Sequence, residues 1–160
     1  NIQKIRDVYN KLPEECRDSM PAILQHEITC GLNTKKIPEK SAACGLLWLG
    51  RSLNYQCGMF CHLLDNDGAE PYEAASVAYE RDLRPYLPWA IQKICQAAMH
   101  TLKAKRRNQI FAQIGGFDEA CYGRGEEEAT RNDLRNMMNF LKTMLCRWRE
   151  VFSDLELGLI

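Results

Sequence analysis

Two side chains in the stretch 41–64 have the chemistry to hold a polar ligand. Trp48 and Arg51 are three residues apart, so on a helix their indole and guanidinium groups share one patch of surface. An indole offers an apolar face for stacking, and a guanidinium offers several N–H donors. The pair therefore suits a polar ring or an anionic head group. On an arbitrary helix, a core indole beside a solvated arginine is the more common arrangement.

The sequence contains none of the common catalytic motifs. It lacks a G-x-S-x-G elbow, a glycine-rich phosphate loop and an H-E-x-x-H zinc motif. The three histidines, His26, His62 and His100, lie far apart and share no metal spacing. We interpret His26, with its neighbour Glu27, as a surface or capping group. We therefore predict a protein that is not an enzyme and uses no metal and no cofactor.

Length and charge limit the class of protein. At 160 residues the chain is large enough for one domain with a substantial core. Its formal net charge is +0, so electrostatics give no reason to expect a nucleic-acid partner. It shows no secretory signal and no charge-free apolar run of membrane-spanning length. Because Asn1 already lies in a helical pattern, we expect the natural chain to begin upstream.

The number and spacing of the cysteines indicate the redox state of the cellular compartment. There are eight, which could suggest a disulfide framework. None forms a C-x-x-C pair, and several lie inside apolar helical runs. We therefore predict reduced, mostly buried thiols in a cytoplasmic protein.

The stretch 41–64 predicts the central helix of an all-α domain. Its apolar residues recur every three or four positions and cover two faces, so it needs cover from both sides. Similar patterns predict helices over 1–12, 14–30, 72–84, 88–102 and 126–153, and the segment 108–116 ends on a glycine stop. No stretch alternates as a β-strand does. The abundance of apolar helix fits a pocket for a lipid-like ligand, but it also fits a plain helical bundle.

Two charged clusters lie near predicted helix ends. The acidic run 126–128 suits a helix N-terminus, where the helix dipole favours negative charge. The basic run at 103–107 fits a solvated face, a contact with an anionic membrane or a nuclear-localisation-like signal. Taken alone, the solvated face is the ordinary interpretation.

Three segments together resemble the glycolipid transfer protein family. They are NIQKIRDVY at 1–9, GLLWLGRSL at 45–53 and AYERDLRPYLPWAIQKICQAAM at 78–99, and their order and spacing match the family too. The resemblance implies a two-layer all-α sandwich of about eight helices, with one domain over residues 1–160. It also implies a surface site for a head group and an apolar tunnel for lipid chains. We therefore expect a monomer that carries a sphingolipid between membranes and touches membrane surfaces transiently, as a peripheral cytoplasmic protein.

The resemblance also implies roles for single residues. Asn1 and Lys4 match the family's head-group asparagine and lysine. Trp48 matches the tryptophan on which the first sugar stacks, and Arg51 matches a basic position beside it. Trp89 falls in the segment that carries a membrane-facing tryptophan. With it we expect the basic run to contribute to membrane docking, through Lys103, Lys105, Arg106 and Arg107.

One position departs from the family pattern. Leu87 stands where the family has the histidine that binds the ceramide amide, and leucine has no hydrogen-bond donor. Losing such a bond costs on the order of 1–3 kcal/mol when its partner stays buried. We predict a sphingolipid carrier, with glycosylceramide favoured because Trp48 is retained. The alternatives are a ceramide-phosphate carrier, with Lys4 and Arg51 on the phosphate, or a lipid sensor whose transfer is impaired by Leu87.

Overall fold

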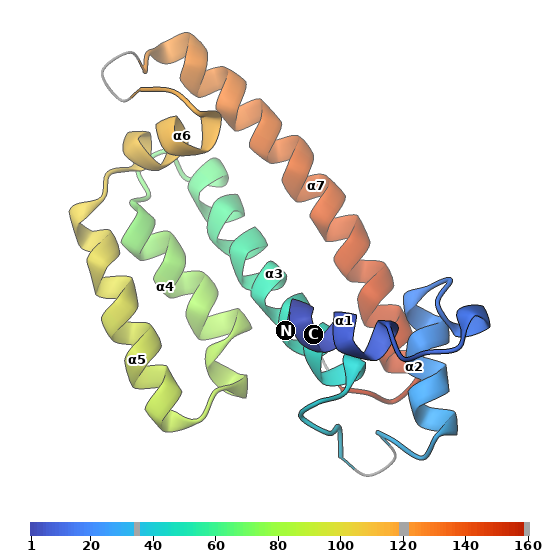
Figure 1. Ribbon diagram of the computed structural model, residues 1–160. Coiled ribbons are helices and arrows are strands. Elements are labelled where there is room, and N and C mark those ends of the chain that lie inside the picture. Colours follow the sequence, from blue (N-terminus) through green and yellow to red (C-terminus); the bar gives the residue numbers. More distant parts are fainter. Residues whose placement is uncertain (34–35, 119–121, 159–160) are drawn as a thin grey trace. The chain divides into compact units, whose positions relative to one another are not determined.

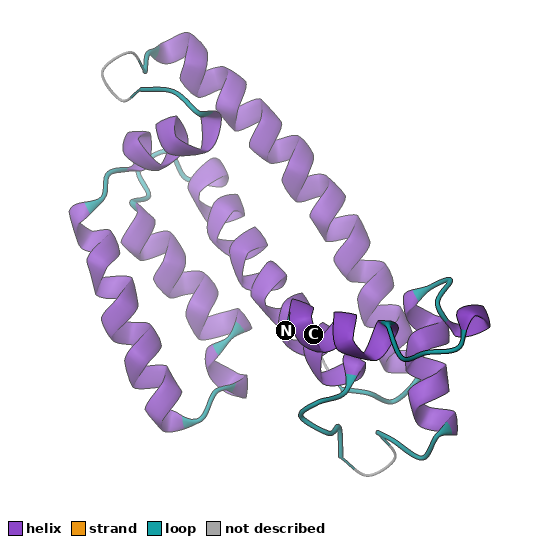
Figure 2. Cartoon of the chain, viewed as in Figure 1, coloured by secondary structure: helices purple, strands orange, loops and turns teal. Residues whose placement is uncertain are grey.

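The computed structural model describes residues 1–33, 36–118 and 122–158. Every regular element in these ranges is helical (Figure 2). The prediction of an all-α fold is confirmed, and the helix count is close to the predicted eight. Seven α-helices follow one another, with 3-10 turns at Glu14–Cys16, Arg84–Tyr86 and Thr101–Ala104 (Figure 1): α1 (Ile2–Tyr9), α2 (Met20–Thr29), α3 (Ala42–Asp65), α4 (Pro71–Asp82), α5 (Trp89–His100), α6 (Arg107–Gly115) and α7 (Arg124–Asp154).

Most predicted helix boundaries lie within a few residues of the observed ones, but the segment 14–30 does not form one helix. A 3-10 turn over Glu14–Cys16 is followed by Ser19, whose extended backbone and side chain cap α2. The hydroxyl of Ser19 accepts from the N–H of Ala22 at 3.4 Å. Pro21 lies in the first turn, where its missing N–H has no helical partner to lose. Ser19 and Pro21 therefore determine where α2 begins, although the apolar periodicity continues across this point.

The chain divides into two compact units. The first comprises Asn1–Ser52 and Met144–Ile160, and the second comprises Leu53–Thr143. Helices α3 and α7 contribute residues to both units. Each unit has its own fully buried large side chains: Leu24, Leu145, Phe152 and Leu157 in the first, and Leu63, Tyr79, Phe111, Leu134 and Met138 in the second.

A buried carboxylate from α2 fixes the start of α3. Glu27 is 2% exposed, and its two oxygens accept from the backbone N–H groups of Ala42 at 2.6 Å and Ala43 at 3.0 Å. The hydroxyl of Ser41 accepts from the next N–H, that of Cys44, at 3.0 Å. These amides belong to the first helical turn, where no helical carbonyl is available to them. Glu27 is thus a capping group, one of the two roles expected for it, and not a surface group. Its charge also suits the helix dipole.

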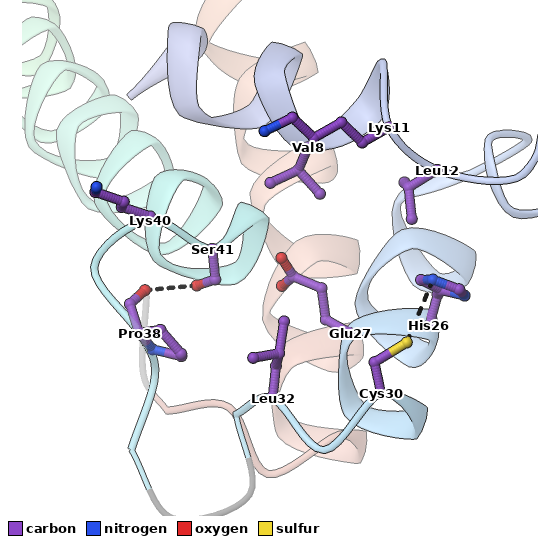
Figure 3. A pocket seen from close by; sticks show the side chains of 10 residues that line it. All are labelled: Val8, Lys11, Leu12, His26, Glu27, Cys30, Leu32, Pro38, Lys40 and Ser41. Carbon is purple, nitrogen blue, oxygen red and sulfur yellow. Dashed lines mark hydrogen bonds between the residues drawn. The ribbon is translucent and has the colours of Figure 1, made fainter.

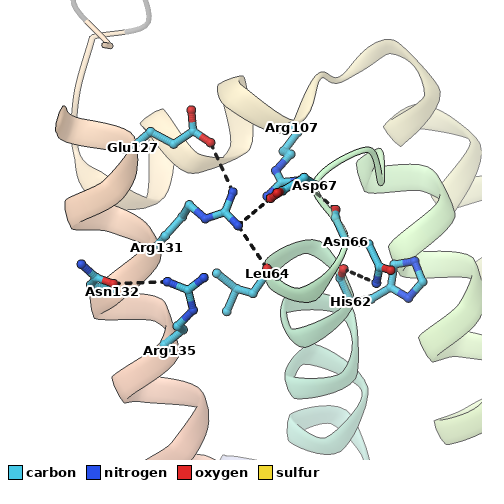
Figure 4. Close-up of polar contacts among 9 residues, drawn as sticks. All are labelled: His62, Leu64, Asn66, Asp67, Arg107, Glu127, Arg131, Asn132 and Arg135. Carbon is cyan, nitrogen blue, oxygen red and sulfur yellow. Dashed lines mark hydrogen bonds and ion pairs between the residues drawn. The ribbon is translucent and has the colours of Figure 1, made fainter. Parts of the chain in front are cut away.

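Two arginines hold the turn between α3 and α4 in the second unit (Figure 4). The carboxylate of Asp67 accepts from Arg131 at 2.7 Å and from Arg107 at 3.4 Å. Arg131 also donates to the carbonyl of Leu64, and Arg107 donates to that of Asn66. The hydrogen bond and charge of Arg131, followed by the charge of Arg107, lower the pKa of Asp67 below its usual value. Helices α6 and α7 are thereby tied to this turn.

Helices α3 and α4 approach closely at Gly58. A Cβ added there would lie 3.3 Å from the Cβ of Ala78 and against the ion-paired side chains of Arg81 and Asp82. Helix α5 runs beside α4 (Figure 1), and the hydroxyl of Tyr79 donates to a carbonyl of α5 at 3.4 Å. None of the α5 residues is buried. This helix therefore leaves apolar side chains accessible.

The prediction of mostly buried thiols is wrong. Of the cysteines in the described ranges, all of them free, only Cys44 and Cys57 are buried. Cys30 caps the C-terminus of α2 and Cys146 lies on an outward face of α7, so both are exposed. Cys121 lies outside the described residues.

Removing the Glu27 carboxylate should destabilise the protein strongly. In Glu27→Ala two buried N–H groups lose their acceptor, and we expect the free energy of unfolding to fall by about 2–5 kcal/mol. Urea unfolding followed by circular dichroism measures this loss. Ser41→Ala, which removes one acceptor from the same helix end, is the matched control and should cost about 1 kcal/mol. Equal losses in the two variants would contradict a leading role for Glu27.

Candidate functional site

Gly45 brings the first turn of α1 onto α3. A Cβ added at Gly45 would lie 2.9 Å from Cγ1 of Ile5, 3.1 Å from the backbone oxygen of Asn1 and 3.5 Å from Cβ of Lys4. A side chain at this position would force α1 away, so the contact requires glycine. Trp48 lies one turn further along the same side of α3. The predicted head-group residues of α1 therefore approach α3 at Gly45, one turn before Trp48, within the first unit.

Trp48 and Arg51 form the predicted patch. The guanidinium carbon of Arg51 lies 5.1 Å from the centre of the Trp48 ring. Arg51 is only 9% exposed and Trp48 is half-buried, so this arginine is not the solvated one expected on an arbitrary helix. A guanidinium held against an indole gains cation–π attraction, which is stronger away from water. We refer to Asn1, Lys4, Trp48 and Arg51, the residues predicted to bind a head group, as the head-group patch.

Lys4 has a weak partner in the loop before α3. Its Nζ lies 3.8 Å from a carboxylate oxygen of Glu39, whose side chain is 90% exposed. Such a long, solvated ion pair contributes little, so a ligand can displace it at small cost. Glu39 gave no signal in the sequence, because an isolated charge in a loop is ordinary. Gly45 was also missed, since a glycine within a helical pattern does not reveal what approaches it.

Leu87 and Trp89 belong to the second unit. Leu87 is half-buried, and its carbonyl accepts from the side chain of Gln92 at 2.8 Å. Trp89 opens α5 and is 73% exposed, with Nζ of Lys93 5.9 Å from its ring centre. Ile94 on the same helix is also exposed. The indole is thus not a core residue, and it stands on a helix with accessible apolar side chains.

The four cations of the basic run differ in their surroundings. Lys103 is exposed and lies 4.6 Å from the ring centre of Tyr72, and Lys105 is also exposed. Arg106 is exposed and lies 3.7 Å from Glu70. The side chain of Arg107 is 11% exposed and is engaged with the α3–α4 turn. Three of the four cations are therefore accessible to solvent.

The described ranges contain neither a membrane-spanning helix nor a cluster of metal ligands. No helix there is both long and apolar enough to cross a membrane. In the same ranges, no three His, Cys, Asp or Glu side chains are grouped so that they could hold a metal ion.

The comparison with known families gives a clear match. The model of the glycolipid transfer protein family matches residues 1–116. A curated relative, the glycolipid transfer protein of Danio rerio, is 30% identical over 105 residues. The aligned region covers 62% of this chain and 49% of the relative. The chain thus spans about half the length of that relative.

Solved structures show the same fold. The human ceramide-1-phosphate transfer protein, in complex with 12:0 ceramide-1-phosphate, superposes with a TM-score of 0.81 at 16% identity, covering 99% of this chain and 74% of that one. FAPP2, described as selecting simple glycosphingolipids, superposes with a TM-score of 0.80 at 18% identity. The match covers 98% of this chain and 71% of FAPP2. The fungal glycolipid transfer protein HET-C2 superposes with a TM-score of 0.76 at 19% identity. The match covers 95% of this chain and 68% of HET-C2.

These findings confirm the resemblance found in the sequence and the fold that it implied. The family model covers most of the chain, and the helical structure agrees with it independently. The prediction that the protein is not an enzyme is confirmed by the nature of the family, which transfers lipids without chemical change. The chain belongs to the glycolipid transfer protein family.

Proposed function

We propose that the protein transfers a sphingolipid between membranes and holds its head group at the head-group patch. The observation that carries this proposal is the close approach of α1 to α3 at Gly45, one helical turn before Trp48. The asparagine amide can donate to and accept from sugar hydroxyls, and the ammonium group adds three donors. The indole offers an apolar face to the C–H surface of a sugar.

Exposed apolar side chains support the binding of lipid chains. Within the second unit, Phe140 of α7 is 69% exposed and Met137, one turn before it, is 46% exposed. Ile94 of α5 is 63% exposed. Moving a lipid out of its bilayer costs about 0.8 kcal/mol per methylene unless the chains find apolar cover. Large apolar side chains left accessible to solvent are suited to provide that cover.

We favour glycosylceramide as the ligand, because Trp48 is the kind of residue on which a sugar stacks. Ceramide phosphate is the second candidate, and the burial of Arg51 is the observation in its favour. A guanidinium largely removed from water attracts an anion more strongly than an exposed one does. Lys4 would supply a second cation to the same phosphate. A lipid sensor with weak transfer is the third candidate, supported by Leu87.

Membrane contact is proposed for the accessible residues of α5 and the basic run. Trp89 provides an amphipathic ring of the type that enters membrane interfaces. Lys103, Lys105 and Arg106 provide positive charge toward anionic lipids. Because Arg107 is engaged within the protein, we assign it a smaller share. The protein would act as a monomer in the cytoplasm, bound to membranes only transiently.

Trp48→Ala should slow transfer of glucosylceramide between vesicles about tenfold, because the sugar loses its stacking surface, equivalent to about 1.4 kcal/mol. Trp48→Phe keeps a ring and should retain most of the rate. Transfer of a fluorescent lipid by the full-length chain measures both. Labelled ceramide phosphate run in parallel identifies the head group. A Trp48→Ala variant that folds normally and transfers the sugar lipid at the wild-type rate would contradict the proposed site.

Leu87→His should strengthen sphingolipid binding about fivefold, because it restores a donor worth about 1 kcal/mol for the ceramide amide. Leu87→Phe is the matched control, since it adds a ring without a donor. Titration of the protein with labelled ceramide lipids measures the affinities. If histidine gives no advantage over phenylalanine, Leu87 does not stand at the amide.

Gly45→Val should weaken transfer although it alters no head-group side chain. The new side chain meets Ile5 and the backbone of Asn1, and such overpacking costs about 1–3 kcal/mol. The displaced α1 would move Asn1 and Lys4 away from Trp48. Gly68→Ala is the control, since a Cβ at Gly68 meets nothing within 4 Å. Wild-type transfer by a folded Gly45→Val protein would rule out the α1–α3 contact as the organiser of the patch.

A further inference from the structure

We propose that Cys30 is a reactive thiol that forms a mixed disulfide with an anionic, low-molecular-weight disulfide of the glutathione type. The proposal rests on a cluster of Cys16, His26 and Cys30 beside a pocket of the first unit. None of these residues belongs to the head-group patch. The inference therefore stands independently of the proposed function.

His26 contacts both thiols of the cluster. Its Nε2 lies 3.4 Å from Sγ of Cys30, a contact drawn in Figure 3. Its Nδ1 lies 3.5 Å from Sγ of Cys16. His26 and Cys30 are four residues apart at the end of α2, so one helical turn places base and thiol side by side. A thiol within hydrogen-bond reach of an imidazole is the usual arrangement of an activated sulfur nucleophile.

The geometry favours an external disulfide over a bond between the two cysteines. Each sulfur contacts a different nitrogen of the ring, so the imidazole stands between them. A Cys16–Cys30 disulfide would require His26 to leave this position. Cys30 is exposed, whereas Cys16 is half-buried. A reagent from solution therefore meets Cys30 first.

The pocket beside Cys30 indicates the charge of the reagent. Its volume is about 310 Å³. Lys11 and Lys40 are among the residues that line it (Figure 3). Both are exposed, and within the described residues neither forms an ion pair. The carboxylate of Glu27, which also lines the pocket, already accepts from the amides of α3. The two lysines are thus available to the carboxylates of a peptide-sized disulfide, above an apolar lining of Val8, Leu12, Leu32 and Pro38.

The reaction is a thiol–disulfide exchange and needs no other reagent. The Cys30 thiol gives its proton to His26, and the thiolate attacks one sulfur of the incoming disulfide. One S–S bond breaks as the new one forms. The departing thiolate takes up a proton, and an excess of free thiol reverses the step.

Other cysteines provide internal standards. Cys146 is also exposed, and in the described residues no histidine lies within hydrogen-bond distance of it. Burial, followed by its neighbour Cys61, raises the pKa of Cys57 to about 11, which keeps this thiol protonated and slow. Cys61 is half-buried. Cys146 is therefore the matched comparison for Cys30.

The test is the exchange of the full chain with glutathione disulfide at neutral pH, followed by peptide mass mapping over time. Cys30 should gain the adduct about tenfold faster than Cys146 in the wild-type protein, a comparison that needs no variant. His26→Gln should slow Cys30 about tenfold and leave Cys146 unchanged. In the double variant Lys11→Gln/Lys40→Gln, Cys30 should lose its preference for glutathione disulfide over the cationic disulfide cystamine.

Four results would overturn the proposal. They are equal rates at Cys30 and Cys146, fastest reaction at Cys61, a Cys16–Cys30 disulfide as the main product, or a wild-type preference for cystamine. Thermal melting of His26→Gln distinguishes lost activation from lost structure. Because the readout is a covalent mass at a mapped residue, it is unaffected by whether the protein transfers lipid.

Discussion

The buried carboxylate of Glu27 is the contact on which the head-group patch depends. A charge removed from water must find close partners, and this one accepts from two amides of α3 and from the side chain of Asn33. These bonds determine where α3 begins. From Ala42, three residues follow at steps of three: Gly45, Trp48 and Arg51. A start displaced by one residue would turn all three by about 100° around the helix axis. The capping hydrogen bonds thus determine the direction in which Gly45, Trp48 and Arg51 point from α3.

Two glycines of α3 allow close helix contacts, one in each unit. In the first unit, Gly45 receives α1, and in the second, Gly58 receives α4. Each contact brings two helices closer than a larger side chain would allow. The second unit also contains ion pairs that connect its helices. Through them, Asp67 joins α6 and α7 to the turn that ends α3. One helix therefore serves as a structural element of both units.

The sequence predicts those parts of the structure that depend on local spacing. Apolar periodicity located α3, α5 and α7, and the three-residue step between Trp48 and Arg51 predicted their shared patch. Contacts between distant segments left no such signal. The burial of Arg51 depends on what surrounds it in space, and Arg107 meets Asp67 from forty residues away. From the sequence, His26 is interpreted as a surface or capping group. Its contact with Cys16 could not be predicted, because that contact depends on the helix break at Ser19, which the apolar pattern did not reveal.

The choice between a sugar and a phosphate depends on how the charge of Arg51 is compensated. At 9% exposure the guanidinium of Arg51 depends on partners within the protein. The ring of Trp48 at 5.1 Å offsets part of the cost of burying this charge. The proposed sugar would therefore not have to neutralise Arg51, and the same contact fixes the position of the indole on which we propose that the sugar stacks. Under the proposed function, Arg51 would orient the tryptophan, and Lys4, whose partner Glu39 is distant and solvated, would meet the ligand. This proposed division of roles is our reason for preferring a sugar head group to a phosphate.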